Sequence, residues 1–197
     1  MNYLAHAYLS FGNDEILVGN MISDFVKGKA KFNFPINIQK GINLHRMIDT
    51  FTDTHLATKQ AKQIFKPAVG LYSGAFIDVA YDHFLARDEE EFSLESLENF
   101  AKKTYEVLNN YTSLLPEKFN DIFPFMSSRN WLLNYRFTQG IEKSFGGISR
   151  RAKYLKNDIS VFHLLIENYD QLYSCYQQFF PAVKEFAFGE YTMLIKE

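Results

Sequence analysis

The chain has 197 residues, of which 47% are hydrophobic and 17% aromatic, and its formal net charge at pH 7 is -2. This length suits one domain with a sizeable core, and the hydrophobic fraction excludes a disordered chain. The single cysteine, Cys175, excludes an internal disulfide and a zinc site built on thiolates. No apolar run approaches the roughly 20 residues of a membrane span. Residues 1–15 lack the basic segment and long apolar stretch of a signal peptide, so we expect a cytoplasmic protein.

Apolar residues recur at helical spacing along the first half of the chain, and the alternation typical of strands is scarce. Asn13 is a good N-cap for the first of these helices, and Pro35 suits the first turn of the second. The third is expected to end before Pro67. The helices expected in this half cover residues 13–28, 35–49, 54–65 and 67–87.

The second half continues the helical pattern, with Ser93 as an N-cap and Pro116 opening a shorter helix. Pro181 is expected to interrupt the C-terminal helical region and divide it in two. We predict an all-α fold, one bundle-like domain over residues 1–197. The segments expected to be helical here are 93–108, a short one from 116, 127–137, 148–155 (helical or turn-like) and two from 158 onward.

The stretch "LHRMIDTFTD" places His45, Asp49 and Asp53 at steps of four, on nearly the same face of a helix. Such a row of polar side chains is typical of a solvated helix face. It is also typical of a face that turns inward toward a metal ion or a substrate. The spacing alone leaves both interpretations open.

A second cluster, Asp78, Asp82 and His83, lies in the otherwise apolar stretch "GAFIDVAYDHFLA". Burial of an ionised carboxylate costs several kcal/mol unless it is paired or bound to a cation. Two carboxylates one turn apart also repel each other, and a divalent cation reverses that repulsion. The alternative is a narrow exposed stripe that carries these residues into solvent.

The remaining candidates are His6, a hydrogen-bonded core histidine or a member of a site, and Asp24, which has Lys27 one turn later. We interpret His55 and His163 as structural. Carboxylates and imidazoles without thiolates suit a hard or borderline divalent ion such as Mn²⁺, Mg²⁺ or Fe²⁺. Such an ion beside cations that bind phosphate suggests hydrolysis of a phosphoester.

The charges are segregated along the chain, which favours an acidic partner, with solvated basic faces as the alternative. Acids concentrate in residues 87–98, and no known nucleic-acid motif is present. Two stretches hold cations and no acid: Lys27, Lys29, Lys31, Lys40 and Arg46 between Asp24 and Asp49, and Lys143, Arg150, Arg151, Lys153 and Lys156 between Glu142 and Asp158.

Six segments in this order resemble the acyl carrier protein phosphodiesterases over nearly the whole chain: "MNYLAHAYLS", "GNMISDFVKG", "GINLHRMIDTFTDTH", "DVAYDHFLAR", "NWLLNYR" and "GISRRAKYL". The resemblance implies a fold like that of the HD-type phosphohydrolases and a Mn²⁺-dependent reaction. That reaction removes 4′-phosphopantetheine from holo-acyl carrier protein, a small acidic protein, and leaves the apo form. The order Asp82-His83 reverses the His-Asp pair of the wider superfamily, so ligands do not transfer from it by simple alignment.

The residue roles are hypotheses built on these clusters. The metal ligands are predicted to be His45, Asp49, Asp82 and His83, and His6 and Asp24 complete the site or position the attacking water. Asp78 orients a ligand imidazole. Lys27 and Arg46 hold phosphate oxygens, and Arg136, Arg150 and Arg151 dock the carrier protein or bind the phosphate of its arm. The rival interpretations are a phosphohydrolase of nucleotides or other small phosphoesters and a helical module that binds carrier protein without turnover.

Overall fold

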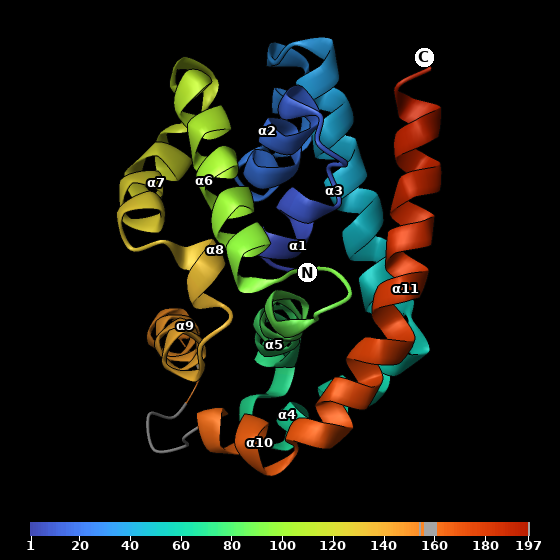
Figure 1. The fold of residues 1–197 in the computed structure, drawn as a ribbon, viewed down its shortest axis with the longest axis vertical. Helices are drawn as coiled ribbons and strands as arrows, with labels where there is room; N and C mark the ends of the chain where they lie inside the picture. The colour runs from blue at the N-terminus through green and yellow to red at the C-terminus, as the bar shows by residue number, and fades with distance from the viewer. Residues whose placement is uncertain (154, 156–160, 197) are drawn as a thin grey trace.

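The computed structural model describes residues 1–153, 155 and 161–196, and within them every regular element is helical (Figure 1). The predicted all-α class is confirmed. None of the described helices is long and apolar enough to cross a membrane. The α-helices are α1 (Tyr3–Tyr8), α2 (Asp14–Ile22), α3 (Ile36–Thr54), α4 (Leu56–Val69), α5 (Ser73–Arg87), α6 (Leu94–Asn110), α7 (Glu117–Ser128), α8 (Trp131–Asn134), α9 (Thr138–Arg151), α10 (Val161–Glu167) and α11 (Tyr169–Leu194). Short 3₁₀ turns are η1 (Ser23–Phe25), η2 (Gly28–Asn33), η3 (Gly70–Tyr72) and η4 (Thr112–Leu114).

Helices α2 and α3 touch along their backbones, and two glycines make this approach possible. A Cβ atom on Gly19 would lie 2.1 Å from the Ile38 carbonyl oxygen, and one on Gly41 would lie 2.3 Å from the Ile16 carbonyl oxygen. No larger residue fits at either position without moving a helix. The contact packs residues 16–19 of α2 against residues 38–42 of α3, and the candidate site lies just beyond it, at Asn20 and His45.

Helix α5 runs through the interior, with side chains buried on nearly all sides. Figure 1 shows α5 in the centre, between α9 and α11. Its Asp82 is fully buried and accepts hydrogen bonds from the backbone N–H groups of Asn2 (3.3 Å), Leu4 (2.7 Å) and Ala5 (3.3 Å). These are free N–H groups at the start of α1, so a side chain from another helix caps α1.

Two prolines do not end helices as predicted. Pro67 lies in the last turn of α4, which continues to Val69. Gly70, with φ +57°, caps the C-terminal end of this helix. Pro181 lies within α11, and the ribbon of this helix changes direction along its length (Figure 1). Proline removes one hydrogen bond and bends a helix, but packing maintains α11, whose Phe179, Phe180 and Val183 are buried.

Other predicted boundaries also moved. The helix expected over 127–137 is interrupted at Asn130, whose left-handed backbone (φ 45°) separates α7 from α8. Asparagine tolerates this conformation better than most residues. Helix α9 starts at Thr138, well before the predicted 148, and passes through the Gly146-Gly147 pair. Lys156 and the predicted helix start at 158 lie outside the described residues.

Candidate metal centre

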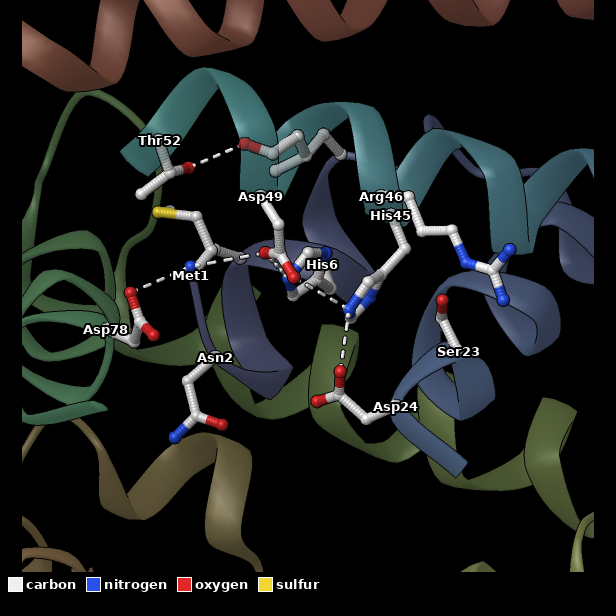
Figure 2. A network of polar contacts seen from close by, with 12 residues as sticks. Met1, Asn2, His6, Ser23, Asp24, His45, Arg46, Asp49, Thr52 and Asp78 are labelled. Carbon is white, nitrogen blue, oxygen red and sulfur yellow. Dashed lines mark hydrogen bonds and ion pairs between the residues drawn. The ribbon is translucent and has the colours of Figure 1, made fainter. Parts of the chain in front are cut away.

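Four of the predicted site residues converge where α1, η1 and α3 meet (Figure 2). His6 comes from α1, Asp24 from η1 directly after α2, and His45 and Asp49 from one face of α3. His6 and His45 are 2% and 5% exposed, and their rings stack with centroids 3.8 Å apart. The polar row on α3 therefore turns inward at His45 and Asp49. Asp53 is exposed and pairs with Lys62.

The Nδ1 atoms of both imidazoles face oxygen atoms of Asn20. The His6 Nδ1 atom lies 2.8 Å from the Asn20 side-chain oxygen, and the His45 Nδ1 atom lies 2.7 Å from the Asn20 main-chain oxygen. Because these oxygens accept hydrogen bonds, each Nδ1 carries its hydrogen and donates it. The lone pair of each neutral ring is then on Nε2.

Both Nε2 atoms face carboxylates. His6 Nε2 lies 3.1 Å from Asp49 Oδ1, and His45 Nε2 lies 3.1 Å from Asp49 Oδ2 and 3.3 Å from Asp24 Oδ1. A lone pair opposite a carboxylate oxygen is repulsive unless a cation, either a proton or a metal ion, lies between them. One ligand atom each from His6, His45 and Asp49 lie within 4.8 Å of one another, a spacing that suits a shared ion.

Without a metal ion, a proton fills this role. Burial lowers the pKa of His45, but Asp24 and Asp49 outweigh burial and raise it to about 9. Burial and the neighbouring charge of His45 lower the pKa of His6 to about 4. Burial raises the pKa of Asp49, yet the two imidazoles hold it well below its usual range. The proton is therefore on His45, which is an imidazolium between two carboxylates, and the neutral His6 keeps an Nε2 lone pair that faces Asp49 with no proton between them.

The centre opens to solvent through a narrow hollow of about 10 Å³, enough for one ion or one water molecule. Its lining residues include Tyr3, His6, Asn20, Met21, Asp24 and His45. The Asp24 side chain is 73% exposed, and its hydrogen bond to His45 lowers its pKa. An ionised carboxylate thus stands between the buried imidazoles and solvent.

Asp78 approaches the centre through an ammonium group rather than an imidazole. The α-ammonium of Met1 lies 3.0 Å from Asp78 Oδ1 and 3.7 Å from Asp49 Oδ1 (Figure 2). The predicted bond between Asp78 and a ligand imidazole is not among its contacts in the described residues. Burial raises the pKa of Asp78, against the effect of the ammonium.

The structure does not bring Asp82 and His83 together with His45. Asp82 caps α1, as described above. His83 is fully buried, with Nδ1 2.6 Å from the Tyr135 carbonyl oxygen and Nε2 2.9 Å from the Tyr169 hydroxyl. The buried carboxylate on α5 is balanced by backbone N–H groups, and the adjacent imidazole links α5 to α11 and the end of α8. Both residues therefore leave our proposed ligand set.

Two of the predicted phosphate-binding cations are hydrogen-bonded to backbone carbonyl groups. Arg46 donates to the Val26 carbonyl oxygen at 2.8 Å, and Arg136 donates to the Ala86 carbonyl oxygen at 2.7 Å. These two guanidinium groups tie backbone segments together. The side chains of Lys27, Arg150 and Arg151 are exposed.

Opposing charges act on Tyr3, which lines the hollow. Burial and the charge of Asp24 raise the pKa of Tyr3 to about 12, and the charge of Arg151 acts in the opposite direction. The Tyr3 ring, in turn, packs against Trp131, with the ring centroids 6.3 Å apart. The lining of the hollow thus includes a protonated phenol that packs against the Trp131 ring.

Comparison with known proteins shows which family the chain belongs to. The family model described as acyl carrier protein phosphodiesterase matches residues 1–183. The chain belongs to the acyl carrier protein phosphodiesterase family. Curated relatives of that name are 32% identical in Enterobacter sp. (93% of this chain, 95% of the relative) and 30% identical in Photorhabdus laumondii (94% of each). A third, from Escherichia coli O6:H1, is 30% identical over 94% of this chain and 96% of its own length.

No solved structure matches the chain. The resemblance to HD-type phosphohydrolases therefore stays a prediction, whereas membership of the acyl carrier protein phosphodiesterase family is shown. Asn20 was not predicted from the sequence as a residue of the site. The available signal was an amide in an otherwise apolar turn of α2, "ILVGNMI", where a buried polar side chain requires partners.

Proposed function

We propose that the protein hydrolyses the phosphodiester that joins 4′-phosphopantetheine to a serine of holo-acyl carrier protein. The products are apo-acyl carrier protein and 4′-phosphopantetheine. The observation that supports this most directly is the pair of imidazole Nε2 atoms that face Asp49, in a chain of this family. We further propose that residues 1–197 form one domain, supported by a hydrophobic core whose residues run from Met1 to Ala187. We also propose that the protein acts in the cytoplasm.

A divalent cation fits the centre, and His6, His45 and Asp49 would hold it, with Asp24 beside them. Bound there, it would polarise the phosphate and lower the pKa of a water molecule. Two imidazole nitrogens with carboxylate oxygens suit Mn²⁺ or Fe²⁺ better than Mg²⁺, which prefers oxygen ligands alone. Of these two ions we propose Mn²⁺ as the cofactor, because the family resemblance implies it.

The chain's own groups then divide the remaining work. Asp24 stays ionised at the rim of the hollow, so its carboxylate can accept a proton from water at the phosphorus. Tyr3 stays protonated and can donate a hydrogen bond to a phosphate oxygen. Arg151, whose charge acts on Tyr3, and Lys27, three residues after Asp24, supply charge for the same oxygens.

The size of the hollow favours a macromolecular substrate over the rival small phosphoesters. With a volume of about 10 Å³, it does not enclose a nucleotide, so the phosphate of a substrate meets the hollow from outside. A partner that binds the surrounding surface would hold the phosphodiester there. A carrier protein with its phosphate on an exposed serine meets this requirement.

The lysines of η2 provide a surface for such a partner. No residue of η2 is buried, Lys27 and Lys29 are exposed, and Phe32 and Ile36 are each 63% exposed despite being apolar. Positive charge around exposed apolar side chains suits an acidic protein, and docking by such charges mainly raises the association rate. Arg150 at the end of α9 is the other docking candidate.

The test is the mass of holo-acyl carrier protein after incubation with the protein and Mn²⁺. We expect loss of the arm, and recovery of 4′-phosphopantetheine. An unchanged carrier mass would refute the proposal, and hydrolysis of small phosphoesters instead would support the rival enzyme. To test docking, we expect Lys29→Ala to raise the KM for the carrier protein. The KM of this variant should also depend less on salt concentration than the wild-type KM does. Lys59→Ala, an exposed lysine on α4, is the matched control.

A further inference from the structure

We propose that Asn20 is the positioning residue of the centre, and that its side chain and main chain each fix the tautomer of one histidine. Asn20 is fully buried, and both of its oxygen atoms face an imidazole Nδ1. This inference rests on the cation site of the proposed function, but it does not depend on the substrate.

The orientation of the Asn20 amide follows from its other contacts. Its Nδ2 atom lies 2.8 Å from the His6 carbonyl oxygen and 3.1 Å from Ser10 Oγ. The Ser10 hydroxyl already donates its hydrogen to the same carbonyl at 2.8 Å, so its oxygen is an acceptor toward Asn20. Two acceptors require the NH₂ group on that side. The amide oxygen is therefore the atom that faces His6 Nδ1, and His6 must donate to it.

The two histidines depend on Asn20 in different ways. His6 is held by the Asn20 side chain, which a substitution removes. His45 is held by the main-chain oxygen, which every substitution retains. Because α2 and α3 are in backbone contact at Gly19 and Gly41, that main-chain oxygen lies at a fixed place on α3. The prediction is specific: a change at residue 20 releases the His6 ring and leaves the hydrogen bond of the His45 ring in place.

Release of His6 matters because only the Nδ1–H tautomer presents a lone pair at Nε2 toward Asp49. Hydrogen-bonded partners of this kind typically change metal affinity by about 10- to 100-fold when they are removed. We therefore expect Asn20→Leu, which is similar in size but has no acceptor, to weaken Mn²⁺ binding by about 10- to 100-fold. No new contact with the cation is needed for this loss.

The experiment is performed on the full chain without substrate. Two-bond ¹⁵N–¹H spectra of the metal-free protein at pH 7 report the His6 tautomer, and titration with Mn²⁺ reports affinity. We expect wild-type His6 to be Nδ1–H and Asn20→Leu to show a mixture of tautomers with the weakened affinity. Ser10→Ala is the matched control, because it removes a bond to Asn20 Nδ2 and leaves the bond to His6 Nδ1.

Three results would overturn the inference. The first is a wild-type His6 that carries its hydrogen on Nε2, which is measured even if Asn20→Leu does not fold. The second is an Asn20→Leu protein with the wild-type tautomer and affinity. The third is an equal loss of affinity in Ser10→Ala, which would indicate a general packing effect. Cleavage of carrier protein enters none of these readouts, so failure of the proposed substrate would leave them unchanged.

Discussion

Because His45 carries a proton in the metal-free protein, we predict that the free energy of unfolding of this protein falls as pH rises. In the folded chain the pKa of His45 is raised to about 9, against an ordinary value of 6.5. A raised folded pKa stabilises the fold fully below pH 6.5, and this stability is lost as pH rises toward 9. Between pH 7 and pH 8 the folded chain keeps this proton while the unfolded chain has released most of it. The free energy of unfolding then falls by about 1.4 kcal/mol per pH unit.

The other shifted groups contribute less than His45 between pH 7 and pH 8. The pKa values of His6 and His83, each lowered to about 4, affect stability mainly below pH 6.5. The α-ammonium of Met1, raised from 8.0 to about 10, acts mainly above pH 8. Asp82, whose pKa burial raises to about 7, acts mainly below pH 7. His45 is thus the main source of the slope in this interval.

Urea unfolding followed by circular dichroism, in EDTA at pH 7.0 and 8.0, measures this slope. His45→Gln should remove the loss of about 1.4 kcal/mol, and saturating Mn²⁺ should also remove it, because the ion takes the place of the proton. Equal stability at the two pH values would refute the bridged imidazolium. The same slope in His45→Gln would assign it to another group.

Three substitutions test other parts of the account. Gly41→Ala places a Cβ 2.3 Å from the Ile16 carbonyl oxygen and should destabilise the fold by about 3 kcal/mol or more in urea unfolding, whereas Gly147→Ala, with 3.8 Å to Arg151, should change it little. Asp82→Ala leaves three N–H groups of α1 without their acceptor and should cost about 2 kcal/mol in the same assay. His83→Gln should leave the Mn²⁺ dissociation constant within about twofold, and a loss of more than about tenfold would restore His83 as a ligand.

Much of the fold was predictable because helical periodicity is a local property. The starts of α2, α3 and α6 follow from Asn13, Pro35 and Ser93, which act on their own first turns, whereas α2 ends at Ile22, before the predicted 28, and α3 continues to Thr54, beyond the predicted 49. The errors at Pro67 and Pro181 have a different origin. Whether a proline ends a helix or only bends it depends on burial of the flanking side chains, and burial is set by distant parts of the chain.

The predictions for the site also divide into features set by local spacing and features set by packing. The i, i+4 spacing of His45 and Asp49 fixes their common face, but only the packing of α1 and α2 decides that this face turns inward. For Asp82, the sequence indicated that a buried carboxylate needs a counterpart. It did not indicate whether that counterpart is a metal ion or the free N–H groups of α1, since both satisfy the same requirement. The fold decides between the two counterparts, because it brings the Leu4 N–H group next to Asp82, which lies 78 residues later in the chain.

The most direct test of the central claim is the electron paramagnetic resonance spectrum of Mn²⁺ bound to the full chain, recorded with and without ¹⁵N-labelled histidine. The account predicts one bound ion per chain with hyperfine coupling to two imidazole nitrogens. One coupling should disappear in His6→Ala and the other in His45→Ala. A bound ion without histidine coupling, or coupling that persists in both variants, would contradict a centre built from His6, His45 and Asp49.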